Sequence, residues 1–245
     1  MEIREYQNLA DREITYFWHV GRREILHEAI ERHSYGVPSS RAILDVGCGT
    51  GGNMLLLKDY GSVTGIDFSD EAIRLAQGKG FATLCQADAT KLPFDGHSFD
   101  LATSLDVLEH IPGDEIAIGE VYRVLRKNGL FVVTVPAYQW LFSQHDVALH
   151  HMRRYTKKEM TNKLKAAGFE IQQASYFVML GVFMNGLRKV FDMLRRTSAS
   201  VHTYDVVYPD SVNTLLLSEL RLEKKWLRFF PLPFGTSIFV VAKKV

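Results

Sequence analysis

Short apolar runs alternate with segments of helical character along the first 135 positions of the chain. Each run has the length of a buried strand. Five runs predict strands, at 42–46, 62–66, 82–86, 99–104 and 130–135. Apolar periodicity and capping residues predict helices between them, at 53–60, 71–77 and 113–125. This alternation predicts a doubly wound α/β fold with a mainly parallel sheet.

The two ends of the chain depart from this alternation. Apolar spacing predicts an amphipathic helix over 13–32, so we expect residues 1–38 to form an N-terminal helical segment. The last third predicts a helix over 157–167 and strands at 169–177 and 236–242.

A long insertion separates the last two predicted strands. Residues 178–233 contain two predicted helices, at about 181–196 and 212–228. An insertion of that length exceeds an ordinary connection between elements. We therefore expect residues 178–233 to form a helical lid or a partner surface.

The composition is that of a globular protein, with 47% hydrophobic and 23% charged residues among 245. We expect a single domain over 1–245. The net charge of +1 provides no field for a polyanion, so nucleic acid is not expected as a partner. Cys48 and Cys85 cannot form a zinc site by themselves. We expect no metal site and interpret both as reduced thiols in a cytoplasmic protein.

Membrane association has little support in the sequence. Residues 1–10 carry charges and lack an apolar core segment, so we expect no signal peptide. No uninterrupted apolar segment reaches the ~18 residues that a transmembrane helix requires. The apolar stretch 176–191, followed by basic residues, allows peripheral membrane contact, but core packing is the favoured interpretation.

The first predicted strand runs directly into a glycine-rich turn at residues 47–52. Glycine lets the backbone approach a ligand closely, and a helix that starts just afterwards points free N–H groups at the same place. Gly47, Gly49 and Gly52 match a dinucleotide-binding pattern. Asp45 with Gly47, Gly49 and Gly51 matches an acid-x-G-x-G-x-G pattern of nucleoside-binding methyltransferases. The turn alone leaves both interpretations open.

Acidic residues follow the next two predicted strands. Asp67 ends the second strand, where a carboxylate can accept hydrogen bonds from both hydroxyls of a ribose. Asp88 follows the third strand, where it can accept from an adenine amino group. Because the carboxyl ends of parallel strands meet at one edge, both acids and the glycine turn should line one site. The ribose contact fits NAD or S-adenosylmethionine, and segment 88–100 favours the second.

With these residues the chain resembles the class I S-adenosylmethionine-dependent methyltransferases, and more narrowly their type 11 group. The resemblance implies S-adenosylmethionine as cofactor and a Rossmann-like seven-stranded sheet whose last strand is antiparallel. The matching motifs occur in order over about 40–135: Leu44-Asp45-Val46-Gly47-Cys48-Gly49-Thr50-Gly51, Gly65-Ile66-Asp67, Asp88-Ala89, Leu92-Pro93-Phe94, Ser98-Phe99-Asp100 and Val107-Leu108-Glu109-His110.

The resemblance also implies which residues contact the cofactor. The glycine loop would face its amino-acid end, Asp67 its ribose and Asp88 its adenine, while the backbone of Leu105 would lie along its methionine moiety. Segment 17–22 is similar to an N-terminal W-x-x-x-R motif whose arginine meets the cofactor carboxylate, here Arg22, with Arg23 as competitor. The expected cofactor-binding residues are Asp45, Gly47, Cys48, Gly49, Gly51, Asp67, Phe68, Asp88, Ala89, Leu105 and Arg22. For Asp45, a structural role in the loop is an equal alternative.

The acceptor is less visible in the sequence. Segment 151–156 is similar to an H-x-R-R-Y-T motif of family members whose acceptors are mostly unknown. A hydroxyl acceptor needs a proton acceptor, for which the candidates are His151, His145 and His150, one of them oriented by Asp146. A carboxylate acceptor needs no base and could be held by an arginine. The expected acceptor-binding residues are Trp18, His110, Arg153, Arg154 and Tyr155.

The sequence therefore predicts methyl transfer from S-adenosylmethionine to a small organic acceptor, with oxygen as the favoured atom. The acceptor pocket should lie between the N-terminal helix, segment 137–156 and the insertion 178–233. Alternatives are methylation of a peptide or protein carboxylate and a cofactor-binding module without turnover. An NAD-dependent oxidoreductase ranks third, because the chain offers only an insertion where a second domain is expected.

Overall fold

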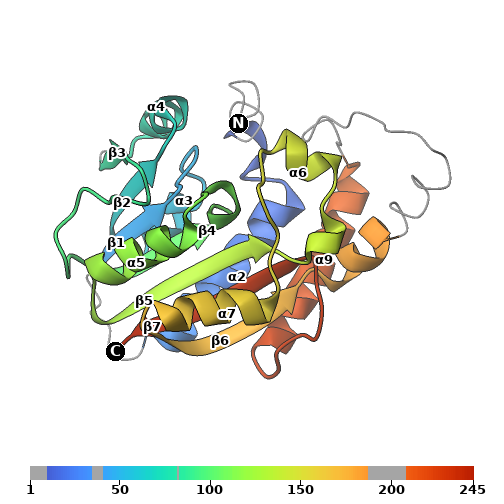
Figure 1. Ribbon diagram of the computed structural model, residues 1–245. Coiled ribbons are helices and arrows are strands. Elements are labelled where there is room, and N and C mark those ends of the chain that lie inside the picture. Colours follow the sequence, from blue (N-terminus) through green and yellow to red (C-terminus); the bar gives the residue numbers. More distant parts are fainter. Residues whose placement is uncertain (1–9, 35–40, 82, 187–207) are drawn as a thin grey trace.

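The computed structural model describes residues 10–34, 41–81, 83–186 and 208–245. These ranges form a sheet of seven strands in the order β3-β2-β1-β4-β5-β7-β6 (Figure 1). The strands are β1 (Arg41–Val46), β2 (Gly61–Asp67), β3 (Leu84–Gln86), β4 (Phe99–Leu105), β5 (Leu125–Pro136), β6 (Phe169–Phe177) and β7 (Ser237–Lys244). Strands β1 to β5 pair in parallel, and β7 is antiparallel to both β5 and β6. The predicted doubly wound sheet with an antiparallel last strand is confirmed.

Different helices cover the two faces of the sheet. Helices α5 (Asp114–Val124) and α7 (Lys157–Ala166) lie in front of the sheet in Figure 1, and α2 (Phe17–His33) lies behind it. Leu164 of α7 shares a core with Val133, whereas Ile30 of α2 shares one with Val132. Because side chains alternate along a strand, these neighbouring valines supply the two separate cores.

Several boundaries differ from the predictions. The helix predicted over 53–60 is reduced to α3 (Met54–Leu57), whereas α4 (Asp70–Gly78) begins after the Ser69 cap as its sequence indicates. Strand β5 begins at Leu125, before the predicted 130, and passes through Asn128 with a φ of 66°. Segment 137–156 contains short elements that the sequence did not indicate: η2 (Gln139–Leu141) and α6 (Gln144–Ala148). A further single turn, η1 (Leu108–His110), follows β4.

The described parts of the insertion pack against the N-terminal helix. They comprise helical turns at 179–186 and α9 (Asp210–Leu227), and the rest of the predicted helix 181–196 lies outside the described residues. Gly21 of α2 lies against α9, since a Cβ there would come within 2.4 Å of Leu220 Cδ1. Glu24 of α2 accepts from both Arg221 and Lys224, each at 2.9 Å. The insertion is thus fastened to α2, and its role as a lid stays a prediction.

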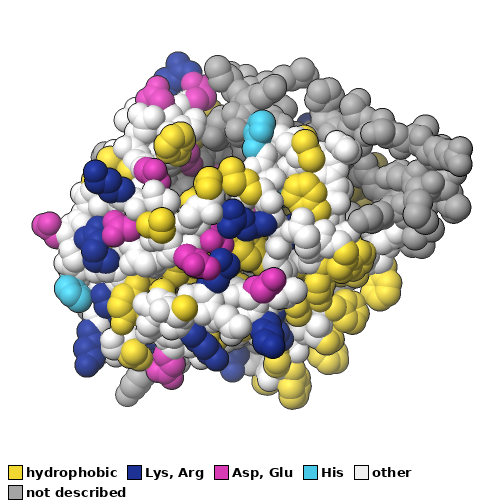
Figure 2. All heavy atoms as spheres, in the orientation of Figure 1, with side chains coloured by type: hydrophobic (Ala, Val, Ile, Leu, Met, Phe, Trp, Pro, Cys, Tyr) yellow, Lys and Arg dark blue, Asp and Glu magenta, His cyan; other side chains and the backbone are white. Residues whose placement is uncertain are grey.

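An apolar surface lies on α9 and the turn after it. Its large exposed side chains are Leu215, Leu222, Trp226, Phe229 and Phe230. Figure 2 shows hydrophobic side chains gathered at the lower right, where Figure 1 places this part of the chain. Within the described ranges, every helix is too short or too polar to span a bilayer. The stretch 176–191, for which core packing was favoured over peripheral membrane contact, lies partly outside the described residues.

Candidate functional site

A cavity of about 1700 Å³ opens beyond the carboxyl ends of β1, β2 and β4. Its wall combines the glycine turn, the start of α2, η1, segment 141–154 and the described ends of the insertion. Pockets for one small ligand typically measure about 300–1,000 Å³. The cavity therefore has room for two ligands side by side, at the edge of the sheet where doubly wound proteins bind them.

The glycine turn forms one wall of this cavity through Gly47, Cys48 and Gly49. Gly47 has a φ of 71°, and a Cβ there would lie 2.4 Å from Val107 Cγ2, so both conformation and space require glycine. Gly51 was also expected at the cofactor. It instead faces away from the cavity, where an added Cβ would lie 2.9 Å from the ring of Phe81.

The acids after β2 and β3 line the neighbouring wall. Asp67 accepts hydrogen bonds from the backbone N–H groups of Gly49 at 3.0 Å and Ser69 at 2.9 Å. Burial raises the pKa of Asp67 despite these bonds. Asp88 is exposed and accepts from the N–H and hydroxyl of Thr90, which lowers its pKa. Two further predicted residues on this wall are Phe68, which is 76% exposed, and Ala89.

Asp45 lies behind the turn instead of at the cavity. It is 1% exposed, and its Oδ1 accepts from the hydroxyl of Thr103 at 2.6 Å. Burial raises the pKa of Asp45 to about 7, although the bond from Thr103 opposes this shift. Of the two roles predicted for Asp45, the structure supports the structural one.

Arg22 and Leu105 meet at the cavity wall. Arg22 Nη1 donates to the carbonyl of Leu105 at 3.4 Å and forms an ion pair with Asp106. The buried Nε of Arg22 has no hydrogen-bond partner. Asp106 has a φ of 58° and was not singled out in the sequence. The cation expected to meet the cofactor carboxylate is thus already paired with a protein carboxylate.

Sequence reasoning missed Glu13, which lies at the cavity just before α2. Its Oε2 accepts from the hydroxyl of Thr50 at 2.8 Å, and its Oε1 pairs with Lys79. A Cβ on Gly52 would lie 2.2 Å from the same carboxylate. The available sequence signal was that Glu13 is an acid at the start of the first amphipathic pattern. Only the fold brings its carboxylate to the glycine turn.

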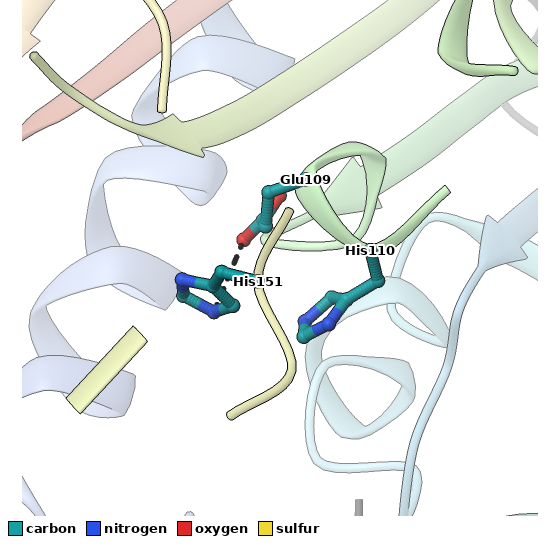
Figure 3. Close-up of side chains that lie close together, drawn as sticks. All are labelled: Glu109, His110 and His151. Atoms are coloured by element: carbon teal, nitrogen blue, oxygen red, sulfur yellow. Dashed lines mark ion pairs between the residues drawn. The ribbon is translucent and has the colours of Figure 1, made fainter. Parts of the chain in front are cut away.

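A polar cluster lies at the cavity wall: Glu109, His110 and His151 line the cavity, and Asp146 lies behind His151. Figure 3 shows Glu109 and His110, both on η1, pointing toward His151. His151 lies in the loop after α6. The N–H of Met152 donates to the carbonyl of Glu109 at 2.9 Å, which holds this loop against η1. The rings of His110 and His151 lie edge to face, with centroids 4.7 Å apart.

The cluster contains one paired and one unpaired carboxylate. Asp146 Oδ1 lies 2.8 Å from His151 Nδ1, and although burial raises the pKa of Asp146, bonds from His151 and Arg154 outweigh it and lower that pKa. Glu109 is fully buried, and neither carboxylate oxygen has a hydrogen-bond partner. Burial, and then the charge of Asp106, raises the pKa of Glu109 well above its usual value. Burial and His151 lower the pKa of His110 to about 4.

The remaining histidine and tryptophan candidates are spread along the wall. His145 is exposed and lines the cavity, but His150 is exposed with a φ of 58° and lies off the wall. Trp18 lines the cavity and stacks on Phe177, with ring centroids 5.5 Å apart.

The arginines and the tyrosine of segment 151–156 have partners within the protein. Arg154 reaches the cavity, but it donates to both oxygens of Asp146, at 2.8 and 3.0 Å. Arg153 pairs with Asp114 at 3.3 Å, and the buried hydroxyl of Tyr155 lies 2.9 Å from the same residue. Neither Arg153 nor Tyr155 lines the cavity, because the side chains of both contact Asp114.

Comparison with known proteins agrees with this geometry. Residues 44–133 match the model of a family described as a methyltransferase domain. A cycloartenol-C-24-methyltransferase of Oryza sativa subsp. japonica is 30% identical over 165 residues, which cover 58% of this chain and 47% of that protein. A probable S-adenosylmethionine-dependent methyltransferase of Mycolicibacterium smegmatis is 27% identical over 166 residues, covering 66% and 61%. The matches thus span about half the length of these curated relatives.

Solved structures share the fold. A putative sarcosine dimethylglycine methyltransferase from Galdieria sulphuraria superposes with a TM-score of 0.60 at 18% identity, covering 91% of this chain and 85% of that chain. A putative Haloferax volcanii methyltransferase, solved with the Trm112 methyltransferase activator, gives 0.58 at 17% identity, covering 98% and 97%. The family match over residues 44–133, the sheet order and the glycine turn at the strand ends agree with these likenesses: the chain resembles the class I S-adenosylmethionine-dependent methyltransferases.

Proposed function

We propose that the protein transfers a methyl group from S-adenosylmethionine to a hydroxyl oxygen of a small organic acceptor. The observation that carries this proposal is that one cavity is lined both by a nucleoside-type wall and by His151, whose Nδ1 is paired with the buried Asp146. The wall includes Asp67 at the end of β2 and Asp88 after β3. The cavity volume leaves room for an acceptor beside the cofactor.

The residues of the wall suit S-adenosylmethionine. Asp67 would hold the ribose, and Asp88 with the exposed ring of Phe68 would hold the adenine. Gly47, which has no room for a side chain, lets the backbone approach the amino-acid end, and Leu105 adds its buried apolar surface. When bound, the cofactor supplies a methyl carbon whose bond to sulfur breaks, with its electron pair, as the bond to the acceptor oxygen forms.

His151 is the proposed catalytic residue. Its Nδ1 is engaged with Asp146 at 2.8 Å, which leaves Nε2 to accept the hydroxyl proton. Asp146 also stabilises the imidazolium that this transfer creates, as buried carboxylates do for other catalytic histidines. The rest of the site positions the acceptor and excludes water, which is the larger part of catalysis for such a displacement.

The structure weakens the carboxylate alternative. A bidentate grip on an acceptor carboxylate needs an arginine with free donors in the cavity. Arg154 already donates two hydrogen bonds to Asp146. Arg153 is paired with Asp114 and does not line the cavity. A cofactor-binding module without turnover would not need a buried polar cluster beyond the cofactor wall, so the cluster supports an enzyme.

Methylation at carbon is the second candidate. The rice relative is named for methyl transfer to C-24 of cycloartenol, and part of the cavity wall suits an apolar acceptor. Its large apolar side chains are Trp18, Leu141, Leu180, Met184 and Leu216.

Product analysis separates these candidates. The protein would be incubated with S-adenosylmethionine labelled at the methyl group and with hydroxylated, carboxylated and sterol acceptors, and the products analysed by mass spectrometry. We expect a labelled methyl ether, and we expect His151→Gln to lower kcat by about 10²–10⁴ with unchanged affinity for S-adenosylhomocysteine. His27→Gln, an exposed substitution on α2 away from the cavity, should retain full activity. A methyl ester or a C-methyl product would replace the proposal with the corresponding alternative.

A further inference from the structure

Within the described residues, the buried carboxylate of Glu109 has no hydrogen-bond partner. Its exposure is 0%, and neither oxygen accepts a hydrogen bond. An isolated buried carboxylate is strongly unfavourable and is normally compensated by hydrogen bonds, an opposite charge or a metal ion. His151 Nε2 lies 3.9 Å from Glu109 Oε1, which is too far for a hydrogen bond.

Three metal-ligating side chains converge at this carboxylate (Figure 3). One ligand atom from each of Glu109, His110 and His151 lies within 4.8 Å of the other two. Bonds of about 2.0–2.2 Å to one ion place neighbouring ligand atoms roughly 3–4 Å apart. The present separations therefore exceed those around a bound ion by only about 1 Å.

We propose that Glu109, His110 and His151 bind one divalent transition-metal ion. Two imidazoles and one carboxylate are a ligand set typical of zinc, manganese and iron(II), whereas magnesium and calcium prefer oxygen ligands alone. All three residues line the cavity, so an ion among them would be accessible to a ligand there.

Asp146 supports this assignment from behind His151. Histidine ligands usually donate their second ring N–H to a carboxylate or carbonyl, which fixes the tautomer and orients the ring. Asp146 Oδ1 is 2.8 Å from His151 Nδ1, which directs the unprotonated Nε2 toward Glu109. Asp146 is itself fixed by Arg154 and by the backbone N–H of Ser143.

The local charges also favour a cation. Arg22 is paired with Asp106, and Arg154 is paired with Asp146, so these two ion pairs are neutral overall. An ionised Glu109 adds one negative charge to be neutralised, and within the described residues its oxygens accept no hydrogen bond. A divalent ion would supply that neutralisation and occupy the space between the two imidazoles.

The ion deepens the proposed function, and this part of the inference rests on it. A bound metal ion lowers the pKa of a coordinated hydroxyl and holds its oxygen in place. The acceptor class is then an alcohol or phenol whose oxygen can bind a metal. With His151 Nε2 acting as a ligand, the ion replaces the imidazole in activating the hydroxyl, whose proton passes to solvent, while Asp146 keeps its orienting role.

Cobalt(II) titration of chelator-treated protein tests the site without any methyl transfer. We expect saturable binding of one ion, reported by visible absorption bands of the bound cobalt and by calorimetry, and competition by zinc. Glu109→Gln and His110→Gln should each weaken binding at least tenfold, and His27→Gln should not change it. Circular dichroism and thermal unfolding of each variant show whether it is folded. If only one of Glu109→Gln and His110→Gln folds, that variant alone is sufficient to test the site.

Absence of a saturable site, or equal affinity in all four proteins, would overturn the inference. Titration of the same samples with S-adenosylhomocysteine keeps the two proposals apart. If the nucleoside binds and cobalt does not, the metal site is wrong and the proposed function stands. If cobalt binds and the nucleoside does not, the proposed function fails and the metal site stands.

Discussion

The hydroxyl of Thr50, in the glycine turn, donates a 2.8 Å hydrogen bond to the carboxylate of Glu13, which precedes helix α2. Glu13 is only 4% exposed and also pairs with Lys79 just after α4. One carboxylate thereby joins the residues before α2 to the glycine turn and to the end of α4. The described residues just before α2 are thus held against the glycine turn.

This relationship predicts that Glu13→Ala weakens cofactor binding. Hydrogen bonds to a charged group contribute about 1.5–3 kcal/mol, and their loss frees the turn from the N-terminal segment. Since 1.4 kcal/mol corresponds to a factor of ten, we expect the dissociation constant of S-adenosylhomocysteine to rise about tenfold or more in calorimetry. Asp11→Ala, an exposed substitution two positions earlier, is the matched control and should bind normally. Equal affinities would show that the turn is rigid without Glu13.

A second prediction concerns Asp67, whose two oxygens accept from Gly49 and Ser69. Asp67→Asn keeps the size of the side chain but removes the charge and one acceptor. If this carboxylate binds the ribose, affinity for S-adenosylhomocysteine should fall about 10- to 100-fold, with a small change in melting temperature. Asp59→Asn, an exposed acid outside the cavity, serves as control. An unchanged dissociation constant would place the ribose elsewhere.

A third prediction compares two glycines. Gly47→Ala places a Cβ 2.4 Å from Val107 Cγ2 at a φ of 71°, so we expect a loss of about 1–3 kcal/mol in the free energy of unfolding. Gly119 lies in the middle of α5 with nothing within 4 Å of an added Cβ. Gly119→Ala should therefore stabilise the protein by about 0.5–1 kcal/mol through helix propensity. Urea denaturation measures both, and equal effects would contradict the assigned strain.

Strands β1 and β2 could be predicted from the sequence because each is a short, largely apolar run that meets a glycine or an acid at its end. Residues 99–104 were predicted as a strand, and β4 extends them by one residue to Leu105. The acids Asp67 and Asp88 were placed at one edge by topology alone, and both line the cavity. Local pattern and fold agree at these positions, so sequence reasoning suffices there.

The acceptor side could not be predicted in the same way. Glu109 and His151 are 42 positions apart, and the backbone bond from Met152 to Glu109 that joins their segments has no signature in residue pattern. Side-chain chemistry was equally misleading for Arg153 and Tyr155, which look like ligand-binding residues in an irregular segment. Both are held by Asp114, a contact that only the packing of segment 151–156 against η1 creates.

A last prediction uses the buried carboxylate of Asp45, whose pKa burial raises from 3.8 to about 7. A group whose pKa is higher in the folded state gives stability that is complete below its unfolded pKa and is lost as the pH rises through the folded value. Ionisation of Asp45 therefore costs stability progressively between pH 4 and 7, by about 4 kcal/mol at most, at ~1.36 kcal/mol for each pKa unit. Asp45→Asn lacks this titration and can still accept from Thr103. In urea denaturation we expect the free energy of unfolding of Asp45→Asn, relative to wild type, to increase over that pH interval and then to level off. For the control Asp59→Asn, the difference from wild type should stay constant with pH. A constant difference for Asp45→Asn as well would mean that the buried carboxyl does not titrate in this range.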